Sequence, residues 1–264
     1  MASNDNSVSI FTSLRYDPIL LNSPINTSLS GTNTPCPLYM LTFHSDRLRA
    51  AANHFNFSPE AQALCELQSV ETRITEELRK YHAESSHSKA TPLKVRVEIF
   101  NSDPPRAKIG LVEMPKVTLD TLYPEKMPEP NTESKWEAVL DTQPTTKSDF
   151  TRYKTNRRAQ YDAARERVGI KGYLEPKEVL LWNEEGEVME ASVAAVFVKR
   201  KGEWRGMRRE AGGLGSTVAR WLKESGLVKT EEGEEERVRR TDVKSGDWVV
   251  LGNGARGIWG AWVR

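Results

Sequence analysis

Apolar and polar residues alternate most regularly in LKVRVEIF, residues 93–100. Every second residue from Leu93 to Ile99 is aliphatic, which predicts a half-buried β-strand. The two prolines at 104 and 105 are expected to turn the chain toward another strand near residues 109–112. Nearer the start, SLRYDPILLNS (residues 13–23) predicts a strand that leads into a turn.

Helical spacing of apolar residues marks two further segments. TFHSDRLRAAANHF, residues 42–55, has apolar residues that share one helical face. Residues 58–82 predict one longer helix, in which Ser58 caps the first turn and Pro59 takes the first helical position. The apolar positions of that helix are Leu64, Leu67, Ile74, Leu78 and Tyr81. This half of the chain is therefore expected to be α+β.

The second half has a different pattern. Prolines and charges in YPEKMPEPNTESK, residues 123–135, resist regular structure. Residues 178–204 and 247–263 contain β-branched and aromatic runs broken by glycine turns, which predict antiparallel strands. Between them, residues 212–226 predict a glycine-rich turn that enters a short helix, and the acidic run from Glu231 predicts a solvated loop. We therefore expect an N-terminal α+β lobe (1–122), a linker (123–148) and a C-terminal β-rich lobe (149–264).

Composition narrows the classes of protein. The 264 residues include 38 basic and 37 acidic side chains, a balance that argues against nucleic acid as a partner. The only cysteines, Cys36 and Cys65, argue against a disulfide framework or a zinc cluster, so no metal is expected. No apolar run reaches membrane-spanning length, and the N-terminus lacks the pattern of a leader peptide. The expectation is a cytoplasmic protein without a membrane partner.

Three features carry candidate chemistry, and each has a plainer interpretation. Lys154 lies in the basic stretch DFTRYKTNRRAQYDAARERV, which predicts a helix, and is a surface charge unless a partner exists. Glu190 lies between two apolar strands, and faces either a ligand or water. GLGSTVAR offers backbone amides at a helix start to an anion, but such loops are commonly mere turns. The turn LGNGARGIW, with Asn253, has the same two interpretations.

Taken in order, these pieces resemble the fold-type IV pyridoxal-phosphate enzymes, which include branched-chain and D-amino-acid aminotransferases and aminodeoxychorismate lyases. The resemblance implies a phosphate-binding arginine in HSDRL (Arg47) and a cofactor-bearing lysine in YKTNRR (Lys154). It implies that the glutamate of GEVMEA, Glu190, faces the pyridine nitrogen. It assigns the phosphate-binding turn to Gly215, Ser216 and Thr217. The implied fold has an N-terminal α/β sandwich-like lobe and a C-terminal β-barrel-like lobe with helices.

Within that group, FTSLRYDP and NGARGIWGAW are most similar to fungal aminodeoxychorismate lyases. That resemblance implies pyridoxal 5′-phosphate as cofactor, a small anionic substrate, a homodimer, and conversion of 4-amino-4-deoxychorismate to 4-aminobenzoate and pyruvate. Arg256, Asn253 and, as an outside candidate, Arg96 would contact the substrate. The chain departs from the family pattern at three positions. The family usually has asparagine where this chain has Ala195, serine or threonine where it has Gly252, and arginine where it has Val218. A class-IV aminotransferase and a degenerate, non-catalytic interaction protein therefore stay open as alternatives.

Overall fold

A computed structural model describes residues 8–84, 88–173, 175–229 and 237–264. The chain divides into two compact units. Unit 1 comprises the residues up to Leu119 together with 154–157 and 254–256, and unit 2 comprises 120–153, 158–253 and 257–264. Most of the acidic run predicted as a loop, residues 231–236, lies outside the described residues. Two short segments that carry candidate site residues therefore belong to unit 1 although their neighbours in sequence belong to unit 2.

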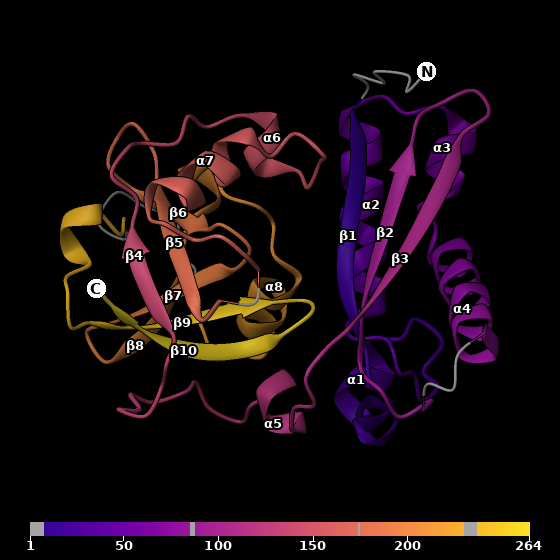
Figure 1. Cartoon of the computed structure of the whole chain (residues 1–264), viewed down its shortest axis with the longest axis horizontal. Coiled ribbons are helices and arrows are strands. Elements are labelled where there is room, and N and C mark those ends of the chain that lie inside the picture. The colour runs from indigo at the N-terminus through magenta and orange to yellow at the C-terminus, as the bar shows by residue number, and fades with distance from the viewer. Residues whose placement is uncertain (1–7, 85–87, 174, 230–236) are drawn as a thin grey trace. The chain divides into compact units, whose positions relative to one another are not determined.

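Unit 1 contains a three-stranded antiparallel sheet in the order β1-β2-β3 (Figure 1). Its strands are β1 (Ser9–Tyr16), β2 (Leu93–Phe100) and β3 (Arg106–Glu113). In β2 the alternation in the sequence becomes strict alternation of buried and half-buried side chains, so the predicted strand is confirmed. The strand predicted after the two prolines is β3, and β1 begins four residues earlier than predicted.

Two helices of unit 1 pack on this sheet, α2 (Leu41–His54) and α4 (Leu67–Glu84). The unit also contains η1 (Pro18–Asn22), α1 (Pro24–Ser28) and α3 (Pro59–Ala63). The predicted cap is confirmed, because the Ser58 side chain accepts a hydrogen bond from the Ala61 amide. The single long helix predicted over 58–82 is wrong, since residues 64–66 separate α3 from α4. There the Ser45 hydroxyl donates to the Cys65 carbonyl at 2.8 Å, a tertiary bond that no local pattern reveals.

Unit 2 contains a seven-stranded sheet in the order β6-β5-β4-β10-β9-β7-β8 (Figure 1). Its strands are β4 (Glu137–Leu140), β5 (Lys177–Trp182), β6 (Val188–Ala191), β7 (Ala195–Arg200), β8 (Glu203–Gly206), β9 (Trp248–Asn253) and β10 (Gly257–Val263). The hairpins predicted from the sequence are antiparallel, whereas β4 runs parallel to both of its neighbours, β5 and β10. Residues 137–140, which the sequence pattern assigned to the linker, thus form a central strand.

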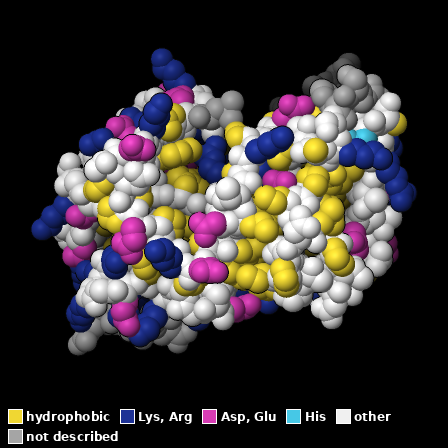
Figure 2. Space-filling model, turned by 90° about the horizontal axis from the view of Figure 1, so that it is seen from below, with side chains coloured by type: hydrophobic (Ala, Val, Ile, Leu, Met, Phe, Trp, Pro, Cys, Tyr) yellow, Lys and Arg dark blue, Asp and Glu magenta, His cyan; other side chains and the backbone are white. Residues whose placement is uncertain are grey.

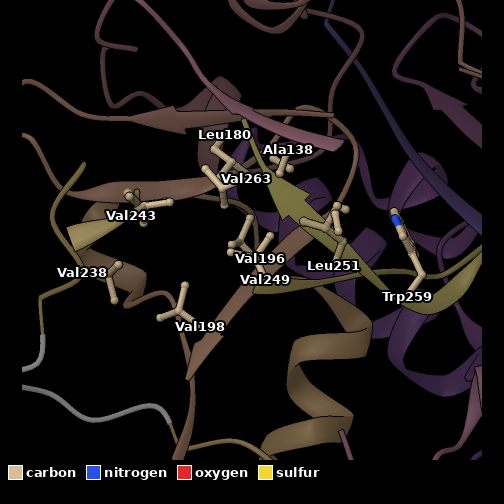
Figure 3. Close-up of a cluster of buried hydrophobic side chains, with 14 residues drawn as sticks. Ala138, Leu180, Val196, Val198, Val238, Val243, Val249, Leu251, Trp259 and Val263 are labelled. Atoms are coloured by element: carbon tan, nitrogen blue, oxygen red, sulfur yellow. The ribbon is translucent and has the colours of Figure 1, made fainter. Parts of the chain in front are cut away.

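The sheet of unit 2 curls around an aliphatic core (Figure 3). The core is built mostly from small branched side chains of strands distant in sequence, including Ala138 of β4, Val196 of β7 and Leu251 of β9. Helical elements complete the unit: α5 (Leu119–Leu122, whose first residue belongs to unit 1), α6 (Asp149–Arg152), α7 (Ala159–Arg167), η2 (Arg209–Ala211), α8 (Thr217–Glu224) and η4 (Arg240–Asp242). Together the two units give the mixed α+β architecture with a curled sheet that was expected.

Acidic and basic side chains intermingle on the face seen in Figure 2. Many form ion pairs, such as Lys199 with Glu129 at 3.2 Å and Lys229 with Glu203 at 2.6 Å. The two cysteines are buried free thiols. Among the residues that the structure describes, no helix is long and apolar enough to cross a membrane, and no group of three His, Cys, Asp or Glu could hold a metal ion.

Candidate active site

Lys154 lies in an extended segment that pairs with β1, and the helix predicted around it is wrong. Helix α6 ends at Arg152 and α7 begins at Ala159, and between them the Phe11 amide donates to the Lys154 carbonyl at 2.9 Å. Thr155 adds an antiparallel bridge to Ile10. This pairing competes with helix formation because it uses backbone groups of the same residues. It fixes the backbone of Lys154 against the sheet of unit 1.

Arg47 and His44 share a face of α2, because they are three residues apart. Arg47 Nη2 donates a hydrogen bond to the hydroxyl oxygen of Thr12 on β1. That oxygen lies 2.6 Å from His44 Nδ1. Burial, and then the positive charges of Arg47 and Lys154, hold the pKa of His44 well below its usual value of 6.5. The structure therefore brings the two predicted cofactor residues of unit 1, Arg47 and Lys154, to the same buried histidine.

Further cations lie beside Lys154. The Lys154 amine lies 5.0 Å from the centroid of the Phe11 ring, and the Arg96 guanidinium lies 3.4 Å from the same centroid. Burial lowers the pKa of Lys94, and the charges of Arg96 and Arg256 lower it further. Lys94, Arg96 and Arg256 thus form a cationic cluster in unit 1, although Arg96 also pairs with Glu98 at 3.1 Å.

A buried arginine anchors the segment that carries Arg256. Arg15 is fully buried, pairs with Asp17 at 2.7 Å, and donates to the Ala255 carbonyl at 3.3 Å. The motif FTSLRYDP therefore has a structural function, because its arginine ties residues 254–256 to unit 1. The charge of Arg15 is satisfied internally, as a buried guanidinium requires.

Glu190 is buried, with 7% of its surface exposed, so its interpretation as a solvent-facing side chain is wrong. It lies on β6, an edge strand, but the hydroxyl of Tyr161 on α7 donates to its Oε1 at 2.7 Å. Burial raises the pKa of Tyr161 well above 10, and the charge of Glu190 raises it further. The phenol therefore stays protonated and donates to the carboxylate.

The glycine-rich turn packs directly against this strand. A Cβ on Gly213 would lie 2.7 Å from the Met189 carbonyl oxygen and 3.5 Å from the Glu190 Cβ. Only glycine permits that approach, and Gly212 adopts a left-handed φ of 97° just before it. Gly215, Ser216 and Thr217 follow at the start of α8, where the Ser216 side chain accepts from the Ala219 amide at 3.3 Å. The turn thus lies beside the buried carboxylate of unit 2.

Asn253 and the departures at 252 and 218 lie near the same turn. The Asn253 side-chain amide donates to the Val193 carbonyl at 3.1 Å, which joins β9 to the loop between β6 and β7. A Cβ on Gly252 would lie 2.8 Å from a methyl of Val218, a fully buried residue of α8. The two departures are therefore coupled, since Val218 takes up the space that a side chain at position 252 would need.

Sequence reasoning missed Tyr161, Thr12 and the tertiary role of His44. His44 was noted only as a letter of the HSDRL motif, and Tyr161 only within the basic stretch. Tyr161 is 29 residues from Glu190, and Thr12 is 32 residues from His44. Pairings over such separations leave no periodic signal, so the only available sign was that each residue stands near a motif.

The chain belongs to the family described as amino-transferase class IV, whose model matches residues 33–261. A Schizosaccharomyces pombe protein named "Putative aminodeoxychorismate lyase" is 27% identical over 223 residues, which are 84% of this chain and 82% of that protein.

Two solved structures have the same fold at low identity. A "Putative amino-acid aminotransferase" from Mesorhizobium loti aligns with a TM-score of 0.67 and 19% identity, over 98% of this chain and all of the other. A branched-chain amino acid aminotransferase from T.th., with pyridoxamine 5′-phosphate, aligns with a TM-score of 0.64 and 16% identity, over 97% of this chain and 76% of the other. The fold is therefore that of the fold-type IV pyridoxal-phosphate enzymes.

Pyridoxal 5′-phosphate is the cofactor of this family. It presents a carbonyl, a phosphate and a ring nitrogen, which call for an amine, cationic or amide donors, and an anion. The described residues include the amine of Lys154, the guanidinium of Arg47 and the buried carboxylate of Glu190. The residues present therefore fit the chemistry of the cofactor.

Proposed function

We propose that the protein is a lyase that converts 4-amino-4-deoxychorismate into 4-aminobenzoate and pyruvate, a step that supplies a folate precursor. The observation that carries the proposal is the cationic cluster of Lys94, Arg96 and Arg256 beside Lys154. The substrate of the lyase carries two carboxylates, whereas a branched-chain amino acid carries one carboxylate and an apolar side chain. The name of the fission-yeast relative supports the same choice.

In this proposal Lys154 would carry the cofactor, and Arg47 and the amides at Gly215–Thr217 would bind its phosphate. Glu190 would face its ring nitrogen, and Asn253 would support the phosphate or a carboxylate. When bound, the cofactor supplies a sink for the electrons left on the substrate carbon that loses its proton. A buried anion at Glu190, held by the Tyr161 hydroxyl, favours the protonated ring nitrogen that makes this sink effective.

The amine of Lys154 performs the proton transfers. With the cofactor bound, Lys154 Nζ would remove the proton from the amine-bearing carbon of the substrate. The same nitrogen then returns a proton to the departing enolpyruvate, and loss of that group leaves an aromatic ring. Its attachment next to Phe11 and Arg96 keeps the amine beside the cluster that binds the substrate carboxylates.

The deciding experiment supplies 4-amino-4-deoxychorismate without any keto acid, and follows 4-aminobenzoate and pyruvate together. Equal amounts of both products support the lyase. If neither forms, while a branched-chain or D-amino acid bleaches the visible cofactor band and a keto acid restores it, the protein is an aminotransferase. A protein that shows no visible band with added cofactor would instead be the non-catalytic family member.

The cationic cluster can be tested separately with a matched pair of arginines. Arg96 stacks on Phe11 next to Lys154, and Arg106 stacks on Phe100 at 4.4 Å on the same sheet. Replacing Arg96 by leucine is expected to raise KM for the dianionic substrate about tenfold or more, as loss of a charge-assisted contact does. Arg106→Leu is the control and should leave KM within about twofold. Equal effects of the two changes would remove the cluster from substrate binding.

Two further expectations belong to this proposal. We expect a homodimer, because twofold symmetric dimers are the commonest of soluble oligomers. We also expect a cytoplasmic location, which suits two buried free thiols in a reducing compartment.

A further inference from the structure

The hydrogen bonds around His44 determine which ring nitrogen carries its proton. Arg47 Nη2 can only donate, and it lies within reach of both the Thr12 hydroxyl and His44 Nδ1, the latter at 3.3 Å. Because the Thr12 oxygen accepts from Arg47, its single proton is available for His44 Nδ1 at 2.6 Å. Both neighbours of Nδ1 can therefore donate to it. The arrangement favours a neutral imidazole with a bare Nδ1 and a proton on Nε2.

The surroundings of His44 stabilise this state. The ring is fully buried, and the charged groups that act on it are the guanidinium of Arg47 and the amine of Lys154. Both charges and the burial lower its pKa, so a third positive charge is disfavoured there. Protonation would also turn Nδ1 into a donor that faces two other donors.

Gly254 closes the opposite edge of the ring. A Cβ on Gly254 would lie 2.5 Å from His44 Cε1, 2.7 Å from Nε2 and 2.8 Å from the Ser13 carbonyl oxygen. The backbone of residues 254–256 is itself held by Arg15 through the Ala255 carbonyl. The ring thus has little room to rotate, and the lone pair of Nδ1 stays aimed at Thr12 and Arg47.

We propose that His44 is a positioning residue that, together with the Thr12 hydroxyl, fixes the Arg47 guanidinium in the orientation that binds the cofactor phosphate. This inference rests on the proposed function, because it takes Arg47 as the phosphate ligand. An arginine side chain loses considerable rotamer freedom when a ligand immobilises it. A guanidinium that is already held by a hydroxyl and an imidazole has lost that freedom before the phosphate arrives.

The test compares two polar replacements in the cofactor-free protein. In His44→Asn the side-chain oxygen occupies the place of Nδ1, whereas in His44→Gln the amide extends toward the place of Nε2. Affinity is measured by fluorescence titration with pyridoxal 5′-phosphate and, separately, with pyridoxal, which lacks the phosphate. We expect His44→Asn to bind pyridoxal 5′-phosphate within about threefold of the wild type, and His44→Gln about tenfold more weakly. Pyridoxal affinity should be the same in all three proteins.

The opposite order would overturn the inference. Glutamine is closer to histidine in volume, so a residue that serves only to fill space would tolerate His44→Gln better than His44→Asn. Equal losses for pyridoxal and pyridoxal 5′-phosphate would also contradict a role at the phosphate. Nitrogen NMR of the wild type provides a readout without cofactor, because a proton on Nδ1 in place of Nε2 would refute the arrangement. If the wild type does not bind pyridoxal 5′-phosphate at all, the proposed function fails together with this inference. If the wild type binds it but the two variants behave in the opposite order, only the inference about His44 fails.

Discussion

The contact between Gly252 and Val218 predicts a measurable coupling between two departures from the family pattern. A methyl group added at Gly252 would meet a Val218 methyl at 2.8 Å, closer than real carbon contacts allow. Val218 is fully buried on α8, so it cannot move into solvent. Gly252→Ala should therefore strain the packing of α8 on β9, and truncation of Val218 in the same protein should relieve that strain.

The size of each effect follows from known packing energies. Overpacking costs about 1–3 kcal/mol, and the reduced freedom of the unfolded chain offsets about 0.4–1 kcal/mol of it. Gly252→Ala should thus lower the free energy of unfolding by up to about 2.6 kcal/mol, with a mid-range value of about 1.3 kcal/mol. Val218→Ala removes two methyl groups from a buried site and should cost about 1–3 kcal/mol. In the double variant the new methyl fills part of the vacated space, so the combined loss should be at least about 1 kcal/mol smaller than the sum.

Urea unfolding of the wild type, the two single variants and the double variant measures this coupling, provided that the m-values agree. The control combines Gly252→Ala with Leu222→Ala. Leu222 is as buried on α8 as Val218 is, but none of its atoms is among those nearest to a Cβ at position 252. That pair should be additive. Additivity within about 0.3 kcal/mol for Gly252 and Val218 would refute the packing argument.

Three other predictions concern Tyr161, His44 and assembly. Tyr161→Phe removes a hydrogen bond to the buried Glu190 and should lower the free energy of unfolding, measured in urea, by about 1.5–3 kcal/mol. Tyr173→Phe at an exposed site is the control and should cost less than about 0.5 kcal/mol. An equally small loss for Tyr161→Phe would contradict the prediction. Because the folded pKa of His44 lies well below 6.5, the unfolded chain binds an extra proton as the pH falls through 6.5, and stability should fall by up to about 2 kcal/mol by pH 5. The difference in stability between wild type and His44→Asn should shrink over that window, and a constant difference would refute the pKa direction. Analytical ultracentrifugation should show a homodimer, and a stable monomer with full turnover would contradict this prediction.

The sequence predicts those elements whose cause is local. Residues 93–100 form a strand because one of their faces is aliphatic throughout, and α3 begins at Pro59 because Ser58 caps it. The helix that ends before Gly226 was also predicted, since the glycine adopts a φ of 75° just beyond it. Patterns of this kind need no knowledge of the partner strand or helix.

The remaining features depend on contacts between distant residues. Ser45 donates to the Cys65 carbonyl between α3 and α4, and Thr155 in the Lys154 segment pairs with Ile10 of β1. Residues 137–140 carry too short an apolar pattern to signal a strand, yet they pair on both sides with β5 and β10. In the candidate site, the motif residues were identified by resemblance, and their assigned roles stay predictions. Their partners Tyr161 and Thr12 required the structure.

Lys154, in its extended segment against β1, is proposed to carry the cofactor. Borohydride reduction of the protein loaded with pyridoxal 5′-phosphate, followed by peptide mapping, tests this assignment, since reduction fixes the cofactor to the amine that holds it. The control variants are Lys154→Ala, which should fold but take up no label and show no turnover, and Lys126→Ala at an exposed lysine, which should label normally. One phosphopyridoxyl group is expected, on the peptide that contains Lys154. A label on a different lysine, or a fully active Lys154→Ala protein, would contradict it.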